Sequence, residues 1–402
     1  MCLLVLQSKD LPSDGRLPAI TPISGQEFTL LKCKNMRTVS TEHSGYGRIL
    51  RSSFQPHPLL PGAHLQTIAS LFRPEPRLVL RRERLELADG DFVDVGWSGD
   101  HNKTGPLALL VHGLCGGFDS KYVRGTACHL IAQGWRTVIL QLRGAGPEPN
   151  RLHRCYNQGD TEDLRYVWHL LREREPQAFI ASVGWSLGGN VTLKALAEEG
   201  KAAPIDIAAA ASVPFSIQPC AERLRTGFSR IYQRRLLDDL KDSLRRKHPN
   251  IAASPLVNLA AALGAKNFIE YDAAYTAPLA GFRDAEDYYQ QSSCGRLLRN
   301  IRRPTLIVHA LDDPFMTTAI VPELDALSPN VTLEVAQSGG HVGFVSADNL
   351  GLPYCWLERR LAAFLHDGFA GRVGVRVRQP KSNEAASSPG YRPLPAPLGW
   401  TA

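Results

Sequence analysis

The sequence has no long apolar run. Although 44% of its 402 residues are hydrophobic, no stretch approaches the roughly 18–20 consecutive apolar residues that a membrane-spanning helix needs. Residues 1–6 include a short apolar stretch but lack the basic segment that opens a secretory signal peptide. We therefore expect neither a transmembrane helix nor a signal peptide.

The cysteines follow no pattern typical of a metal site. All eight are scattered along the chain, with no Cys-x-x-Cys pair and no spacing that suggests shared metal ligation. Reduced thiols of this kind are typical of a reducing compartment. We therefore predict a cytoplasmic protein without a metal centre.

The chain carries a moderate excess of positive charge. The net charge is +7, and residues 220–248 hold nine Lys or Arg against four acidic residues, while residues 368–402 hold five against one. Solvated surfaces and a tail explain such clusters most simply, and weak peripheral contact with an anionic membrane is the alternative. No nucleic-acid-binding motif accompanies the charge, so we expect no nucleic-acid partner.

Both ends of the chain differ from its middle. Residues 1–45 show no hydrophobic periodicity and mix Pro, Ser, Gly and Thr, which predicts a poorly ordered extension. Residues 379–402 hold five prolines with Ser and Ala between them, which predicts a disordered tail. Residues 46–378 are then the folded domain, and whether residues 1–45 belong to the native protein stays open.

The middle of the chain alternates strand-like and helix-like segments. Asp89-Gly90 is a strong turn signal and predicts a hairpin between residues 78–87 and 92–97. Apolar runs typical of buried parallel strands follow, with helical segments between them. The runs are 107–111, 137–142, 179–185, 207–213, 305–310 and 331–335, and the helical segments include 122–133, 160–174 and 190–199. This order predicts an α/β fold with a mainly parallel sheet flanked by helices.

One interval interrupts the alternation. Between Val213 and Pro304 the sequence has helical character and no clear strand, and residues 223–246 are amphipathic and basic. A helical insertion at this point would cover the carboxyl ends of the strands, where ligands bind in such sheets. We therefore predict a lid at about residues 216–300, with a surface excursion far from the site as the alternative.

A candidate nucleophile follows an apolar run. Gly184-Trp185-Ser186-Leu187-Gly188 is a G-x-S-x-G pattern between a predicted strand and a predicted helix. At such a turn the serine stands at the tip, and the helix N-terminus favours negative charge beside it. The pattern alone is weak, because a glycine-rich turn that caps an ordinary helix has the same letters.

The rest of a catalytic triad lies downstream in the expected order. Asp312 and Asp313 follow the run 305–310, and His341 lies in a glycine-rich loop after the run 331–335. In α/β-hydrolases the order is Ser, acid, His, and the histidine takes the serine proton while a carboxylate fixes its tautomer. Counting three residues from Ala310 favours Asp313 as the acid, and Asp312 stays open.

Two backbone amides are candidates for an oxyanion hole. One is the N–H of Leu187, after the nucleophile, and the other is the N–H of Leu114, in the glycine-rich loop after the run 107–111. His112 precedes Gly113 in this loop and is predicted to be a structural ring that braces it. Cys115 is predicted to line the pocket and not to act as a nucleophile.

Together these motifs resemble those of the YheT-type α/β-hydrolases, which are related to ABHD-type lipase-like hydrolases. The resemblance covers roughly residues 54–367. It rests on His112-Gly113-Leu114, Arg143-Gly144, Glu148-Pro149-Asn150-Arg151 and residues 184–190, 312–315 and 340–344, and it extends to Gln66-Thr67-Ile68 and residues 227–232, 277–279 and 282–289.

The resemblance implies an α/β-hydrolase fold and a serine hydrolase that cleaves small carboxylic esters without a cofactor. It assigns the nucleophile to Ser186, the acid to the Asp312–Asp313 pair and the base to His341. The family often has a small or acidic residue where this chain has Cys115, a difference that could alter the acyl pocket.

Other functions stay open. The same triad could transfer an acyl group to an alcohol or lipid acceptor if the lid excludes water. It could also show lipase-like activity on lipid esters at a membrane surface. A binding protein on a hydrolase fold is the non-enzymatic alternative. The physiological ester, its acyl length and the oligomeric state do not follow from the sequence.

Overall fold

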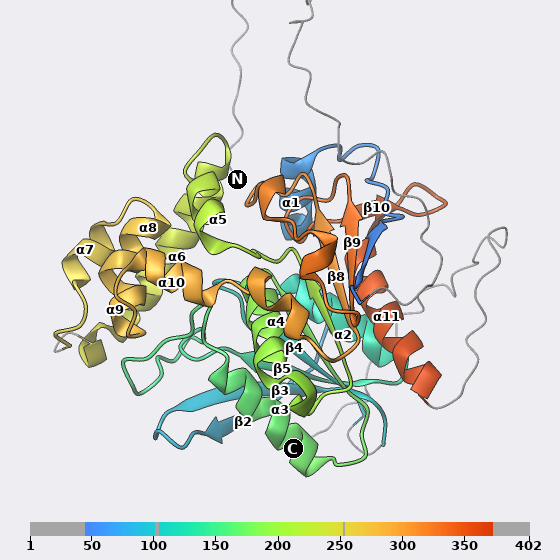
Figure 1. Ribbon diagram of the computed structural model, residues 1–402, viewed down its shortest axis with the longest axis horizontal. Coiled ribbons are helices and arrows are strands. Elements are labelled where there is room, and N and C mark those ends of the chain that lie inside the picture. The colour runs from blue at the N-terminus through green and yellow to red at the C-terminus, as the bar shows by residue number, and fades with distance from the viewer. Residues whose placement is uncertain (1–44, 101–103, 252–253, 373–402) are drawn as a thin grey trace, which may run out of the picture. The chain divides into compact units, whose positions relative to one another are not determined.

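The computed structural model describes residues 45–372, apart from residues 101–103 and 252–253 (Figure 1). The predicted tail at 379–402 and the predicted extension at 1–45, Gly45 excepted, lie outside the described residues.

The described residues form a nine-stranded sheet in the order β1-β9-β8-β7-β6-β4-β5-β3-β2. Only β3 of these strands runs against the others, because it pairs antiparallel with both β2 and β5. The strands are β1 (Arg48–Arg51), β2 (Arg81–Glu86), β3 (Phe92–Ser98), β4 (Leu107–Val111), β5 (Arg136–Gln141), β6 (Ile180–Trp185), β7 (Ile207–Ala211), β8 (Thr305–Ala310) and β9 (Val331–Ala336). The predicted hairpin and the mainly parallel sheet are thus confirmed.

Helices cover both faces of the sheet (Figure 1). The covering helices are α3 (Glu162–Arg174) and α4 (Leu187–Glu199) on one face and α2 (Lys121–Ala132) and α11 (Trp356–Arg372) on the other. Strand β4 explains why the predicted runs are apolar throughout. Leu109 belongs to the buried cluster under α3 and α4, whereas the next residue, Leu110, belongs to the cluster under α2 and α11.

Some elements were not predicted. Strand β1 has three exposed residues of four and pairs only with β9, so its sequence carries no apolar signal. Helix α1 (Ala63–Phe72) and a small hairpin of β10 (Val345–Ala347) and β11 (Pro353–Cys355) were also missed. Helix α1 and the small hairpin lie beside the loop of His341, as described below.

The chain between β7 and β8 forms helices, here called the helical insertion (residues 217–300). Its elements are α5 (Ile217–Leu224), α6 (Ser229–Ile251), α7 (Leu259–Gly264), α8 (Phe268–Tyr271), η2 (Asp272–Thr276), α9 (Ala277–Leu279), α10 (Ala285–Ser292) and η3 (Gly295–Asn300). The insertion has a buried cluster of its own, which includes Leu237, Phe268 and Tyr288. None of the helices in the described part of the chain is long and apolar enough to cross a membrane.

Candidate active site

Ser186 stands at the turn between β6 and α4. Its φ of 52° lies in the left-handed region, which a non-glycine residue rarely adopts. The flanking glycines allow the turn: a Cβ on Gly184 would lie 2.2 Å from the carbonyl oxygen of Gly188, and one on Gly188 would lie 2.3 Å from that of His112. The amide of Ser186 donates to the carbonyl of Ala211 at 2.9 Å, which ties the turn to β7.

A continuous hydrogen-bond relay joins Ser186, His341 and Asp313. His341 Nε2 lies 3.0 Å from Ser186 Oγ, and His341 Nδ1 lies 2.8 Å from Asp313 Oδ2. Because an ionised carboxylate can only accept, Nδ1–H donates to Asp313 and Nε2 is left to accept the serine proton. Asp312 makes a different contact: its Oδ1 accepts the amide of Gly340 at 3.0 Å.

Backbone strain is concentrated around this relay. Within the described residues, every non-glycine residue with a positive φ lies in a loop at the site. These residues are Cys115, Ser186, Ser212, Val342 and Phe344. Such conformations persist only where the surrounding structure enforces them, and they gather at functional sites. One such contact is made by Ser212, whose Oγ accepts a hydrogen bond from the amide of Val342 at 3.0 Å.

Helix α1 holds the loop that carries His341. Thr67 Oγ1 accepts the amide of His341 at 2.8 Å. The side chain of Gln66 makes two bonds to the backbone of Val345: its Oε1 accepts the amide at 2.7 Å and its Nε2 donates to the carbonyl at 3.0 Å. The Gln66-Thr67 motif therefore has a structural role in positioning the histidine.

The two predicted oxyanion amides, of Leu187 and Leu114, differ in their hydrogen-bond surroundings. Leu187 is the first residue of α4, where an amide has no acceptor within the helix. Leu114 lies between two amides that are occupied: Gly113 N–H donates to Tyr122 Oη at 2.9 Å, and Cys115 N–H donates to Tyr156 Oη at 3.0 Å. Among the described residues, no hydrogen-bond partner is found for the Leu114 amide. We call Tyr122 and Tyr156 the tyrosine clamp; sequence reasoning missed both.

His112 braces this loop, as predicted. Its ring is fully buried, Nε2 accepts the amide of Leu142 at 3.1 Å, and Nδ1–H donates to the carbonyl of Gly113 at 2.8 Å. Burial lowers the pKa of His112 to about 4, so the ring is neutral near pH 7. The prediction of a structural role is confirmed.

Cys115 lines the space beside this loop and is not activated. Its Sγ lies 3.6 Å from the carbonyl oxygen of Leu236 in α6. Burial raises the pKa of the Cys115 thiol to about 12, which keeps it protonated, and a thiol in this state is a poor nucleophile.

Phe315 stacks on the histidine ring. The two rings are nearly parallel, at 6°, with centroids 3.9 Å apart. The amide of Phe315 also donates to Asp313 Oδ1 at 2.9 Å, so one residue touches both the acid and the base. No sequence pattern pointed to this contact beyond its place two residues after Asp313.

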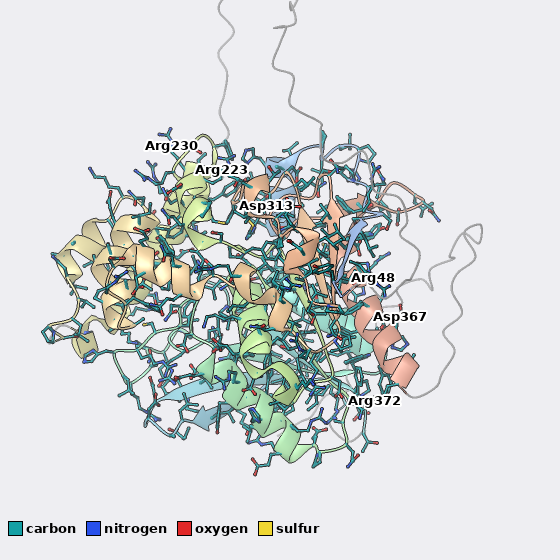
Figure 2. All side chains as sticks on the ribbon, viewed as in Figure 1. Arg48, Arg223, Arg230, Asp313, Asp367 and Arg372 are labelled. Carbon is teal, nitrogen blue, oxygen red and sulfur yellow. The ribbon has the colours of Figure 1, made fainter. Side chains whose placement is uncertain are left out.

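The start of α6 packs against the acid loop and α1. Ser229 Oγ donates to the carbonyl of Pro314 at 2.6 Å, and the ring of Tyr232 lies 5.1 Å from that of Phe315. Tyr232 Oη is 3.1 Å from Nδ1 of His64 in α1. The helical insertion therefore borders the site, and Figure 2 shows Arg223 of α5 and Arg230 of α6 near Asp313 in this view.

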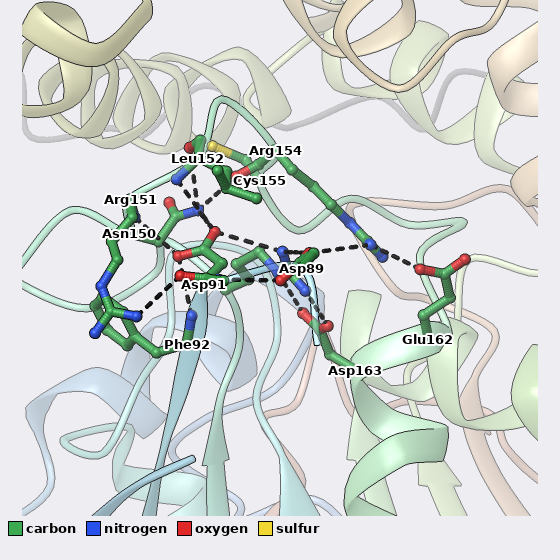
Figure 3. Close-up of polar contacts among 12 residues, drawn as sticks. Asp89, Asp91, Phe92, Asn150, Arg151, Leu152, Arg154, Cys155, Glu162 and Asp163 are labelled. Atoms are coloured by element: carbon green, nitrogen blue, oxygen red, sulfur yellow. Dashed lines mark hydrogen bonds and ion pairs between the residues drawn. The ribbon is translucent and has the colours of Figure 1, made fainter. Parts of the chain in front are cut away.

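A buried polar network supports the loop that carries Tyr156 (Figure 3). Arg143 is only 2% exposed and donates to both oxygens of Asp163, at 2.9 and 2.6 Å. Asn150 Nδ2 donates to Asp91 Oδ2 at 2.5 Å and to the carbonyl of Arg154 at 2.7 Å. The Arg143-Gly144 and Asn150-Arg151 motifs thus stabilise the backbone that leads to Tyr156.

Two cavities meet at Cys115. One, of about 450 Å³, runs along the oxyanion loop and is lined by Leu114, Tyr122 and Val342. The other, of about 840 Å³, lies between α6 and the loop of Tyr156. Neither cavity is lined by Ser186 or His341, so the cavities do not by themselves mark the acyl pocket.

Comparison with known proteins identifies several similar ones. Residues 106–348 match the family model of the alpha/beta hydrolase fold. The chain is 40% identical over 305 residues to YheT of Escherichia coli (strain K12), which carries the name of an esterase; the match covers 75% of this chain and 89% of YheT. It is 30% identical over 289 residues to phospholipase ABHD3 of Mus musculus, covering 69% of this chain and 70% of that protein.

A yeast protein is a further relative. The chain is 27% identical over 281 residues to medium-chain fatty acid ethyl ester synthase/esterase 2 of Saccharomyces cerevisiae (strain ATCC 204508 / S288c). That match covers 64% of this chain and 61% of the yeast protein.

Proposed function

The chain belongs to the α/β-hydrolase fold family, as a relative of the YheT type, and from this membership we propose that it is a serine hydrolase of carboxylic esters. The observation that carries the proposal is the relay Ser186–His341–Asp313, at 3.0 and 2.8 Å. Ser186 is the nucleophile, His341 the general base, and Asp313 the group that fixes the histidine tautomer.

The reaction has two halves. Ser186 Oγ attacks the ester carbonyl while its proton passes to His341 Nε2, and the amides of Leu114 and Leu187 stabilise the tetrahedral oxyanion. His341 then gives this proton to the leaving alcohol, and an acyl-enzyme remains. Water attacks the acyl-enzyme, loses a proton to His341, and the acid departs as Ser186 regains its proton.

The substrate class we propose is a small or short-chain ester. The support for this choice is the resemblance to the YheT type, since neither of the two cavities beside Cys115 is lined by Ser186 or His341. A series of p-nitrophenyl esters of increasing acyl length measures the preference. A kcat/KM that rises steadily through long acyl chains would contradict a short-chain specificity.

Acyl transfer to an alcohol is the second candidate, supported by the name of the yeast relative, which includes ester synthesis. The same acyl-enzyme serves both reactions, and the acceptor decides the product. Ethanol added to the assay would be converted into an ethyl ester by a transferase, whereas a hydrolase releases the free acid.

Labelling by a fluorophosphonate probe tests the proposal directly. The probe reacts with an activated serine, so we expect a covalent adduct on the peptide that contains Ser186. The His341→Ala variant, which lacks the base, is the matched control and should label far more slowly. A folded wild-type protein that is not labelled would instead favour a binding protein on a hydrolase fold.

A further inference from the structure

A group of large apolar side chains is exposed on three neighbouring segments. Each of them is between 46% and 83% exposed, and together they make up six of the fifteen large hydrophobic side chains exposed in the described residues. We call this group the apolar patch: Leu59, Leu65, Phe228, Ile231, Leu350 and Leu352. Clustered apolar exposure of this kind marks an interaction surface, whereas single exposed residues do not.

Two histidines join the segments into one surface. The ring of His64 in α1 lies 4.5 Å from that of Phe228, just before α6. His57 Nδ1 accepts the amide of Leu59 at 3.2 Å, so its Nε2–H donates to the carbonyl of Gly351, at 3.1 Å, in the turn between β10 and β11. Figure 1 shows α5, α1 and β10 in the same upper part of the fold.

The patch borders the candidate active site. Helix α1, which carries Leu65, also holds the histidine loop through the bond from His341 N–H to Thr67. Helix α6, which carries Ile231, packs against the acid loop through Tyr232. A surface bound at the patch would therefore lie next to the approach to Ser186.

Positive charge accompanies the apolar side chains. Between Glu222 and Asp238 the chain holds five arginines and no acidic residue. Three of them, Arg225, Arg230 and Arg234, are exposed and form no ion pair with any described residue. Figure 2 shows Arg230 at the edge of the ribbon, on the same end as Arg223.

One acidic residue, Asp348, lies in the turn that carries Leu350 and Leu352. Its Oδ1 accepts the amides of both leucines, at 2.9 and 2.8 Å, so this carboxylate is engaged in holding the turn.

We propose that the apolar patch and its arginines dock the enzyme on the surface of a bilayer that contains anionic phospholipid, so that short-chain esters that partition into this surface are among its substrates. Apolar side chains enter the boundary between headgroups and acyl chains, and arginines are attracted to anionic headgroups. Binding strength increases with the buried apolar area and with the attraction to anionic lipid, so the two signals add to one another. The substrate part of this proposal rests on the proposed ester hydrolysis, and the docking part does not.

The test compares variants of the full chain by co-sedimentation with vesicles of phosphatidylglycerol and phosphatidylcholine. Ile231→Ser combined with Leu350→Ser removes two apolar side chains from different segments of the patch. The matched control, Leu256→Ser with Leu324→Ser, removes two exposed leucines elsewhere. We expect the patch variant to lose about tenfold or more in vesicle affinity and the control to bind like the wild type.

The charge component has its own variant. Arg230→Gln with Arg234→Gln should weaken binding at low salt and reduce the difference between low and high salt, because exposed charges are screened by ions. Pure phosphatidylcholine vesicles should bind the wild type weakly. Salt-independent binding, or equal binding to both vesicle types, would overturn the role of the arginines.

Docking and catalysis are separated by two further measurements. The inactive Ser186→Ala variant should bind vesicles like the wild type, and the patch variant should hydrolyse soluble p-nitrophenyl butyrate at the wild-type rate but an ester in vesicles more slowly. If neither the wild type nor any variant hydrolyses either ester, the proposed function is wrong. The vesicle-binding measurements would still test whether the patch docks on a bilayer. A wild-type dimer that becomes monomeric in the patch variant, without vesicle binding, would show that a second copy covers the patch and would overturn the proposal.

Discussion

His341 is held on four sides. Its two ring nitrogens contact Ser186 and Asp313, its amide donates to Thr67, and its ring face stacks on Phe315. Each contact removes a rotation that the imidazole would otherwise have. The orientation of the base is therefore fixed before a substrate arrives, which is what general-base catalysis requires.

The two aspartates should differ sharply when changed. Asp313→Asn removes the acceptor that fixes the His341 tautomer, so kcat for p-nitrophenyl butyrate should fall roughly 10³–10⁴-fold. Asp312→Asn changes a carboxylate that only accepts the Gly340 amide, and its effect should be much smaller. If Asp312→Asn is the more damaged variant, Asp313 is not the triad acid.

The tyrosine clamp should affect the transition state and not substrate binding. Tyr156→Phe removes the acceptor for the Cys115 amide, so the oxyanion loop can move and misplace the Leu114 N–H. We expect kcat to fall about tenfold while KM changes little, because the oxyanion exists only in the transition state. Tyr166→Phe, an exposed tyrosine, is the control. A change in KM alone would indicate a role in substrate binding instead.

Individual residues differed in how far the sequence revealed them. The proximity of Ser186, Asp313 and His341 could be predicted, since all three follow strand ends that share one edge of a parallel sheet. Tyr122 and Tyr156 could not be predicted, because they reach the oxyanion loop from 9 and 41 residues away through side-chain contacts. Such pairs are fixed by tertiary packing and leave no local pattern.

Among elements, those buried on both faces were the most predictable. Strands β4 to β9 in the sheet are largely apolar because helices cover each side. Strand β1 lies at the edge of the sheet and is largely exposed, so its four residues resemble a loop. Helix α1 likewise buries only Gln66 and Thr67, both polar, and leaves its large apolar side chains Leu65, Leu71 and Phe72 exposed, so its apolar residues do not mark a buried face.

The strand–turn–helix element at Ser186 should tolerate no side chain at Gly188. A Cβ there would lie 2.3 and 2.4 Å from the carbonyl oxygens of His112 and Val111, so Gly188→Ala should cost roughly 1–3 kcal/mol or more in the free energy of unfolding. Gly264→Ala is the matched control, because nothing lies within 4 Å of its Cβ position. Thermal unfolding measures both, and an equal shift in Tm would contradict this account of the turn.

At the scale of the whole molecule, the helical insertion and the hydrolase core share the site. Ser229 donates to Pro314 in the acid loop, and Cys115 in the oxyanion loop contacts Leu236. The sequence indicated an insertion by its lack of strands but gave no means of placing it, because amphipathic helices do not specify which surface they cover. Its use as a lid stays a prediction.

Buried His112 makes stability depend on pH. Burial lowers its pKa in the folded state from 6.5 to about 4, so the unfolded chain binds the additional proton between these values. Its contribution is fully present above pH 6.5, falls as the pH decreases, and amounts to roughly 3 kcal/mol when lost near pH 4.

The measurement is a difference between two proteins, so that other titrating groups cancel. The free energy of unfolding of wild type minus that of His112→Gln should decrease by roughly 3 kcal/mol between pH 7 and pH 4. Denaturant unfolding at each pH provides both values. A difference that stays constant over this range would mean that the buried ring does not titrate as described.

Hydrolysis of p-nitrophenyl butyrate by the wild type and by Ser186→Ala tests the central claim most directly. If Ser186 is the nucleophile of a triad that acts as a unit, its removal should lower kcat by roughly 10⁴–10⁶-fold while the protein stays folded. Equal rates in the two proteins would contradict the account.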